Sequence, residues 1–246
     1  MSFNRLLPRP GEVTAEQLGG HLDLGSRAPE GRPYVVANMV ETLDGRAAIE
    51  GDTRGLGGPG DRELFHQLRA SADALIAGAG TVRVERYGPA VKNDDLRAAR
   101  ERNGLDPVQP VVIVSARLLL PSDLPLLQDP DSRVIVATAA DHELEGVAAD
   151  VSYERTGDDL GLLLARLRSE HGIRSLLCEG GPTLLSHLLA ARLVDELFVS
   201  IAPKLAGGGD EPTITQGPAL PEPTAAELVW LLERDGELFG RWRLRY

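Results

Sequence analysis

The chain has 246 residues, of which 42% are hydrophobic, so it can form one large α/β domain or two small ones with an ample core. Its formal net charge of −11 argues against nucleic acid or an anionic membrane surface as the main partner, although a local basic pocket could still bind a small anion. The single cysteine, Cys178, excludes an internal disulfide and a zinc site built from several thiolates, and we expect no metal.

The first 32 residues are predicted to be a loosely structured leader with one short helix around residues 14–22. This stretch is polar, contains several prolines and lacks the apolar run of a signal peptide. Nowhere in the sequence do about 18 apolar residues follow one another. We therefore expect a cytoplasmic protein with an N-terminal extension over residues 1–32 and one domain over residues 33–246.

After the leader, short apolar runs alternate with amphipathic segments. The apolar runs predict buried strands at residues 34–40, 74–77, 111–114, 133–137, 173–178 and 195–202. Apolar residues at helical spacing predict helices at residues 61–71, 158–171 and 184–192. Two last strands, 227–234 and 237–246, flank the turn pair Asp235–Gly236, and the Gly- and Pro-rich stretch 203–223 is expected to be a long loop.

This order of elements predicts an α/β fold of three layers, with helices on both faces of a central sheet. Strand–helix–strand crossovers make most of the sheet parallel, and the final hairpin adds antiparallel strands. The expected sheet is therefore mixed.

The run from Leu177 to Leu185 carries the strongest chemical signal. A strand ends at Glu179, two glycines follow, and Pro182 stands where a helix would begin. The first N–H groups and the positive dipole end of such a helix suit a phosphate group. For a glycine pair alone an ordinary tight turn is the more common explanation, so the rest of the chain has to decide.

Small or hydroxylated residues follow other predicted strands. They are Gly78, Gly80 and Thr81 after one strand, Ser115 after the next and Thr138 after a third. Ligands of open α/β sheets bind beyond the carboxyl ends of the strands. Each serine or threonine alone is more often a plain cap, but together they favour a dinucleotide on a sheet that lacks the Rossmann glycine pattern.

The stretch from Glu41 to Arg46 follows the first buried strand and precedes a glycine-rich loop, residues 51–60. Its Asp44–Gly45 pair is common in simple turns. Alternatively, the loop is a mobile flap over an active site, with Gly55, Gly57, Gly58 and Gly60 supplying conformational freedom.

These motifs together resemble one family. The residues that carry the likeness are Thr42–Arg46, Leu68–Ala70, Asp73–Ala74, Gly78–Val82, Glu179–Leu184 and Val194–Leu197. In this order and spacing they are similar to the C-terminal reductase domain of the bifunctional riboflavin-biosynthesis deaminase/reductase, which has the dihydrofolate reductase-like fold. The zinc signature of the deaminase half needs two cysteines, so the resemblance implies a stand-alone reductase.

The resemblance implies an NADPH-dependent reduction of 5-amino-6-(5-phosphoribosylamino)uracil to the ribitylamino product. The sugar ring opens to an imine, and hydride goes to its C1. The resemblance also implies a homodimer. Asp44 and Glu179 are the carboxylates that we expect near the reacting centre and predict to be catalytic.

The resemblance also implies binding residues. Those predicted for the cofactor are Val40, Gly78, Gly80, Thr81, Glu85, Ser115, Thr138, Gly180, Gly181, Pro182, Thr183 and Leu184. Arg117 is added on chemical grounds, because a guanidinium fork matches the 2′-phosphate that distinguishes NADP from NAD. Those predicted for the substrate are Asn38, Thr42, Thr53, Arg69, Lys92 and Glu179.

The chain departs from the family pattern on the substrate side. Asn38 replaces a common lysine, the flap lacks its usual aromatic residue, and Glu85-Arg86-Tyr87 replaces an acidic pair and a proline. Two alternatives therefore stay open: a reductase of a related heterocycle such as dihydrofolate, and an NADP-binding protein with little turnover. The histidines His66, His142 and His171 are predicted to be surface or structural residues.

Overall fold

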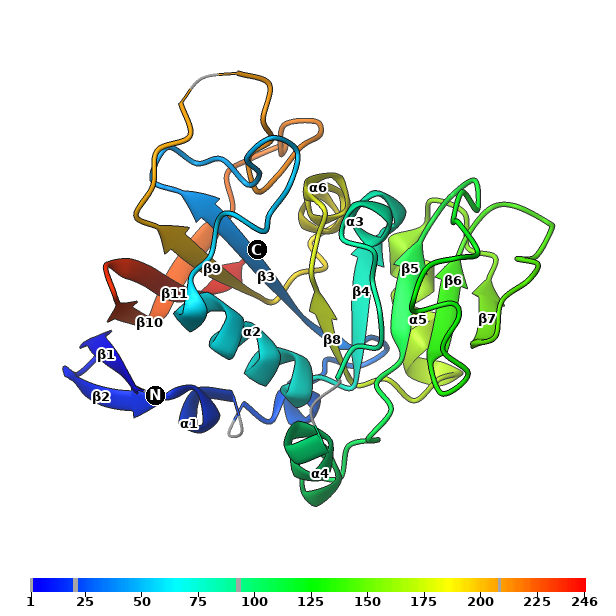
Figure 1. Ribbon diagram of the computed structural model, residues 1–246, viewed down its shortest axis with the longest axis horizontal. Coiled ribbons are helices and arrows are strands. Elements are labelled where there is room, and N and C mark those ends of the chain that lie inside the picture. The colour runs from blue at the N-terminus through cyan, green and yellow to red at the C-terminus, as the bar shows by residue number, and fades with distance from the viewer. Residues whose placement is uncertain (1, 20–21, 92–93, 208) are drawn as a thin grey trace. The chain divides into compact units, whose positions relative to one another are not determined.

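The structure is a computed structural model that describes residues 2–19, 22–91, 94–207 and 209–246. The chain divides into two compact units, coloured by residue number in Figure 1. The first unit comprises residues 1–22, 35–68 and 180–246, and the second comprises residues 23–34 and 69–179.

The first unit is built on a mixed sheet with the strand order β2-β1-β10-β11-β9-β3. Its strands are β1 (Ser2–Leu7), β2 (Gly11–Thr14), β3 (Tyr34–Thr42), β9 (Glu196–Ala202), β10 (Ala225–Arg234) and β11 (Glu237–Arg245). Strands β3 and β9 are parallel, and the other neighbouring pairs are antiparallel. Its helices are α1 (Ala15–Gly19), α6 (Pro182–Ala190) and most of α2 (Pro59–Ser71).

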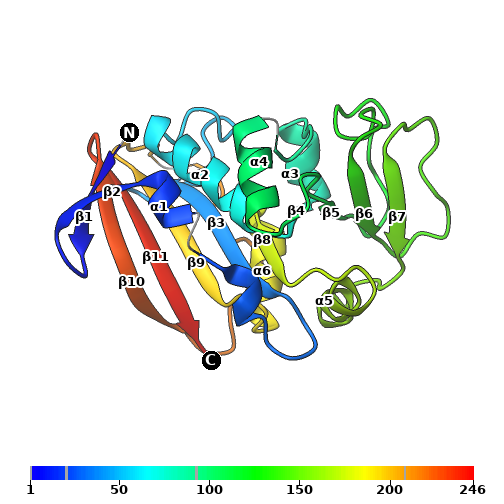
Figure 2. The ribbon, with the colours of Figure 1, turned by 90° about the horizontal axis from the view of Figure 1, so that it is seen from below.

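The second unit is built on a parallel sheet with the strand order β8-β4-β5-β6-β7. Its strands are β4 (Ala74–Gly78), β5 (Val111–Val114), β6 (Arg133–Ala137), β7 (Asp150–Glu154) and β8 (Ser175–Cys178). Its helices are η1 (Leu24–Arg27), α3 (Ala79–Val84), α4 (Asp94–Arg102) and α5 (Leu160–Ser169). Figure 2 shows α5 on the opposite face of this sheet from α3 and α4. Helices on both faces explain why β8 is buried throughout its length.

The predicted α/β class with a mixed, mostly parallel sheet and a final antiparallel hairpin is confirmed. Strands β10 and β11 pair up to the Arg234–Glu237 register, and the two residues between them turn the chain. Asp235 and Gly236 have φ values of 55° and 80°, the left-handed conformation that a two-residue hairpin turn requires.

The N-terminal residues differ from the expected loose leader. Residues 2–14 form the β1–β2 hairpin, which adds to the sheet edge beside β10 (Figure 1). Phe3 and Val13 point into the core, and the ring of Phe3 meets that of Phe239 edge-on at 5.2 Å. Pro8 and Pro10 lie in the turn of this hairpin, between β1 and β2. Strand β7 and helix α4 were not predicted either, because both are short and polar.

The glycine-rich loop before α2 owes most of its glycines to close packing. A Cβ at Gly57 would lie 2.2 Å from Asp61 Oδ2, and one at Gly60 would lie 2.9 Å from Phe239 Cζ. At Gly58 the neighbour is the carboxylate of Glu237, 3.0 Å away. Only Gly55 of the four faces open space. Close packing therefore accounts for glycine at Gly57, Gly58 and Gly60, and the interpretation of the loop as a mobile flap stays a prediction.

Candidate functional site

Glu179 follows the last residue of β8 and is buried among the strand ends of the second unit. Its N–H donates to the carbonyl of Ile76 in β4 (3.0 Å), which holds the chain beside that strand after β8 has ended. Only 8% of the residue is exposed. A carboxylate at such a depth needs partners, and the structure provides them.

Arg69, at the end of α2, is the main partner of Glu179. Its Nε and Nη2 atoms each lie 2.6 Å from one oxygen of the carboxylate, so the two groups form a two-bond fork. Its Nη1 donates to the carbonyl of Ala90 at 3.1 Å. The Arg69 side chain is 15% exposed and that of Glu179 only 3%, so the cation is the more accessible half of the pair.

Tyr87 completes this cluster, and sequence reasoning missed it. Its hydroxyl donates to Glu179 Oε2 (2.7 Å), and the Arg69 guanidinium carbon lies 5.6 Å from the centre of its ring. Burial, followed by the charge of Glu179, raises the pKa of Tyr87 well above 10.0. The phenol therefore stays a donor at neutral pH. The only signal in the sequence was the departure of Glu85-Arg86-Tyr87 from the family pattern.

Asp44, in the first unit, is an exposed carboxylate that joins two loops. It accepts a hydrogen bond from the Thr42 hydroxyl (2.5 Å) and from the N–H groups of Ala206 (3.1 Å) and Gly207 (2.7 Å). These bonds, led by that from Thr42, lower its pKa to about 2. The Thr42 hydroxyl also accepts from the N–H of Arg46 (3.0 Å). Both predicted site residues thus hold the turn after β3.

The other substrate-side residues of the first unit lie on β3 and on the glycine-rich loop. Asn38, Val40 and Thr42 alternate along β3 and so share one face of the strand. Thr53 is exposed, and its carbonyl accepts from Leu56 N–H within a turn. Lys92 lies outside the described residues.

The run from Leu177 to Leu185, from here on the phosphate motif, contains the start of α6 at Pro182, where a helix was predicted to begin. Gly181 is the N-cap and provides no side-chain cap, and Pro182 occupies the first turn. Thr183 is exposed at this end, whereas the Leu184 side chain is buried, so Leu184 could contact a ligand only through its backbone. Gly180 has a φ of 82°, and a Cβ there would lie 3.2 Å from the sulfur of Met39. Both facts require glycine at this position.

Gly78, Gly80 and Thr81 of the second unit lie at the start of the short helix α3. Gly78 is its N-cap, again without a side-chain cap, and Gly80 is exposed. Glu85 ends the helix, with its N–H bonded to the carbonyl of Thr81 (2.9 Å).

The hydroxylated strand ends of β5 and β6 are partly used within the fold. The Thr138 hydroxyl donates to the Ala116 carbonyl (3.2 Å) and accepts from Ala140 N–H (3.1 Å), so it acts as a cap. Ser115 is buried, and its N–H bonds to the Ala137 carbonyl (2.9 Å). Arg117 is exposed.

Of the histidines, His171 has a clear structural partner. Its Nε2 lies 2.8 Å from Glu154 Oε1, and Arg166 contacts the other oxygen of that buried carboxylate at 3.2 Å. These contacts with Glu154 join the end of β7 to the C-terminal end of α5, a role in keeping with the structural interpretation.

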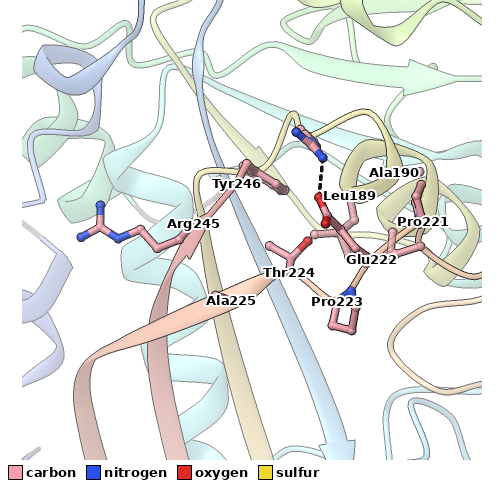
Figure 3. Close-up of a pocket in the computed structure, with 11 residues that line it drawn as sticks. Leu189, Ala190, Pro221, Glu222, Pro223, Thr224, Ala225, Arg245 and Tyr246 are labelled. Atoms are coloured by element: carbon pink, nitrogen blue, oxygen red, sulfur yellow. Dashed lines mark hydrogen bonds and ion pairs between the residues drawn. The ribbon is translucent and has the colours of Figure 1, made fainter.

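A pocket of about 260 Å³ lies in the first unit, at the C-terminal end of α6, whereas the phosphate motif lies at the N-terminal end of that helix. Figure 3 shows residues that line it. Its lining includes Leu189, residues 220–225 and the C-terminal Tyr246. Two arginines, Arg192 and Arg245, line it, and Arg192 is paired with Glu222 at 2.8 Å, the dashed contact in Figure 3. None of the residues lining it is a predicted site residue. Within the described ranges, no helix has the length and apolar character needed to cross a membrane.

Known proteins similar to this chain include some named as pyrimidinone reductases and some named as riboflavin biosynthesis proteins. The family described as "RibD C-terminal domain" matches residues 33–235. The chain is 32% identical to a 2,5-diamino-6-ribosylamino-4(3H)-pyrimidinone 5′-phosphate reductase of Archaeoglobus fulgidus, over 85% of this chain and 96% of that protein. It is 35% identical to the protein of the same name from Methanothermobacter thermautotrophicus, over 78% of this chain and 87% of that protein.

Two further likenesses concern the bifunctional protein and the fold. The riboflavin biosynthesis protein RibD of Escherichia coli is 32% identical over 78% of this chain, which spans 54% of that protein. A solved pyrimidine reductase-like protein from Corynebacterium diphtheriae superposes with a TM-score of 0.78 at 24% identity, over 95% of this chain and 100% of that chain. The second likeness concerns the fold alone.

Proposed function

The chain belongs to the RibD C-terminal domain family, and we propose that it is an NADPH-dependent reductase of a ribosylaminopyrimidine 5′-phosphate in riboflavin biosynthesis. The observation that carries the proposal is the match, over nearly their whole length, to two proteins named as such reductases. The sequence resemblance had implied the same reaction class.

Two compounds with different pyrimidine rings are candidates for the substrate. The resemblance implies the 5-aminouracil compound, whereas both of these relatives are named for the 2,5-diaminopyrimidinone. The two compounds differ at the pyrimidine C2, which carries oxygen in the first and an amino group in the second. They share the ribosylamino phosphate, and this is the part that we propose Arg69 recognises.

Arg69 suits that role because of its depth and its partners. A guanidinium held by a carboxylate on one side keeps a fixed direction, and it is the more exposed half of the pair. The phosphate of the substrate is an anion and is attracted to such a group. Glu179 then acts by orienting Arg69, and Tyr87 fixes the carboxylate from the other side.

The residues proposed for the cofactor fit its anionic groups. Helix α6 begins at a glycine without a side-chain cap, so its first N–H groups can face a pyrophosphate. Gly78, Gly80 and Thr81 offer a second glycine-capped helix start, and Arg117 would meet the 2′-phosphate. NADPH, when bound, supplies the hydride; the chain supplies position and charge.

A purified enzyme assay tests the proposal. NADPH absorbance is followed with each of three substrates: the 5-aminouracil compound, the 2,5-diamino compound and dihydrofolate. We expect turnover of at least one ribosylaminopyrimidine phosphate. Turnover of dihydrofolate alone contradicts the proposal, and tight NADPH binding without any turnover supports a nucleotide-binding protein instead. We further propose that the protein is cytoplasmic and forms a homodimer. Light scattering of the purified protein tests the oligomeric state.

A further inference from the structure

The end of α2, which carries Arg69, is held by a buried cation from another helix. Arg100 of α4 is 0% exposed. Its Nη1 donates to the carbonyls of Arg69 (3.1 Å), Ala70 (3.3 Å) and Ala72 (2.7 Å). Its Nε donates to the Asp106 carbonyl at 2.8 Å. The last carbonyls of a helix lack partners within the helix, and a cation there also complements the helix dipole.

Gln109 holds the same carbonyls from a second direction. Its side-chain nitrogen donates to the carbonyls of Arg69 (2.6 Å) and Ala72 (2.7 Å), and only 4% of the residue is exposed. The N–H of Asp73 would normally serve the Arg69 carbonyl if the helix continued. It donates instead to Ser175 Oγ (2.9 Å) at the start of β8. The backbone of Arg69 therefore depends on Arg100 and Gln109.

We propose that Arg100 and Gln109 are positioning residues for the reductase reaction, because they fix the backbone from which Arg69 reaches Glu179. The inference rests on the proposed function, in which Arg69 binds the substrate phosphate. A guanidinium meets both carboxylate oxygens only within a narrow range of positions. When the carbonyl of Arg69 loses its donors, the end of α2 can unwind and the fork loses its direction.

The opposing explanation is that both residues only stabilise the fold, as buried donors to buried carbonyls usually do. A structural role would lower the free energy of unfolding and leave the Michaelis constant for the pyrimidine unchanged. A positioning role would raise the Michaelis constant for the pyrimidine while that for NADPH stays unchanged. The two explanations therefore differ in a quantity that can be measured.

The test compares Gln109→Met and Arg100→Lys with a control that lowers stability elsewhere in the second unit. Leu167→Ala serves as this control, because Leu167 is fully buried on α5, which covers the opposite face of the sheet from α4 (Figure 2). We expect Gln109→Met to raise the Michaelis constant for the pyrimidine roughly tenfold to a hundredfold. Leu167→Ala should lower the melting temperature and leave that constant unchanged.

A double-mutant cycle sharpens the result. If Gln109 acts only through Arg69, Gln109→Met causes no further loss of kcat/KM in an Arg69→Met background. Equal losses in both backgrounds overturn the proposal, as does an unchanged Michaelis constant in Gln109→Met. If Arg69→Met is inactive or Arg100→Lys does not fold, the comparison of Gln109→Met with Leu167→Ala decides alone. Absence of turnover by the unmodified enzyme would instead contradict the proposed function itself.

Discussion

Arg69 and Glu179 meet in a two-bond fork with both N–O distances at 2.6 Å, although 110 residues separate them in the sequence. Sequence motifs assigned substrate binding to Arg69, and both substrate binding and catalysis to Glu179. The structure makes them a single unit, in which both oxygens of Glu179 accept hydrogen bonds. A carboxylate so engaged is suited to orienting a cation, and Tyr87 strengthens that function.

Breaking this pair should destabilise the protein strongly. Arg69→Met leaves the buried Glu179 without its cation, and we expect a loss of about 3–5 kcal/mol in the free energy of unfolding. Adding Glu179→Gln removes the uncompensated charge and should recover part of that loss. Urea unfolding measures both. Arg192→Met, which breaks the exposed pair with Glu222, is the matched control and should cost about 0–1 kcal/mol. Equal losses for the two arginines would contradict this account.

Removing the Tyr87 hydroxyl should change both stability and its pH dependence. Tyr87→Phe deletes a donor to a carboxylate and should cost about 1.5–3 kcal/mol. Because the pKa of Tyr87 is raised above 10.0 in the folded protein, its contribution is complete below pH 10 and is lost as the pH rises toward the folded pKa.

The alkaline decline in the free energy of unfolding should therefore be weaker in Tyr87→Phe than in the unmodified protein. Tyr153→Phe is the control: it removes a hydroxyl that accepts from the N–H of Leu144 (2.7 Å), and it leaves Tyr87 in place. Urea unfolding between pH 8 and 11 measures both variants. Identical alkaline limbs in Tyr87→Phe and Tyr153→Phe would refute the assignment.

Asp44 should control the order of the loop that contains Ala206. Its pKa is lowered to about 2 from 3.8, so its contribution is present above pH 3.8 and is lost as the pH falls through about 2. Asp44→Ala should speed hydrogen exchange at the amides of Ala206 and Gly207. Asp52→Ala, which removes a half-buried carboxylate that is paired with Arg54, should leave those amides unchanged. Unchanged exchange in Asp44→Ala would show that the loop is held by other contacts.

Arg117 provides a test of cofactor choice. If its guanidinium contacts the 2′-phosphate, Arg117→Ala should weaken NADPH binding about tenfold or more, the scale of one hydrogen bond to a charged group. NADH lacks that phosphate, so its affinity should be nearly unchanged. Calorimetric titration with the two nucleotides measures the difference. Equal losses for both would mean that Arg117 does not read the phosphate.

Strands β4, β5, β6 and β8 of the second unit could be predicted, because their short apolar sequences leave little choice. Residues 111–114 and 133–137 are short, β-branched and apolar, and both strands form over the predicted residues. The hairpin of residues 2–14 could not be predicted, because its two short strands are mostly polar and are separated by prolines. It is stabilised by the neighbouring strand β10 and by the ring of Phe239, which the local sequence does not show.

The candidate site was predicted in part, for a related reason. Glu179 was proposed because it ends a predicted strand, and Arg69 because the Leu68–Ala70 motif resembles that of the family. Motifs could not identify Arg100, since a helix as polar as α4 suggests a solvated surface, whereas Arg100 is wholly buried. Its role depends on the carbonyls of a helix end some thirty residues earlier in the chain, and such a partner is visible only after folding.

The glycine-rich loop offers a comparison between two neighbouring positions. A Cβ at Gly57 would lie 2.8 Å from the Cβ of Asp61, which cannot rotate away, so Gly57→Ala must displace the start of α2. We expect a loss of about 1–3 kcal/mol, as for other overpacked sites. Gly55→Ala adds the same methyl group in open space and should change stability by less than about 0.5 kcal/mol. Urea unfolding of the two variants measures the difference, and equal stabilities would show that the loop adjusts freely, as the flap interpretation of its glycines had supposed.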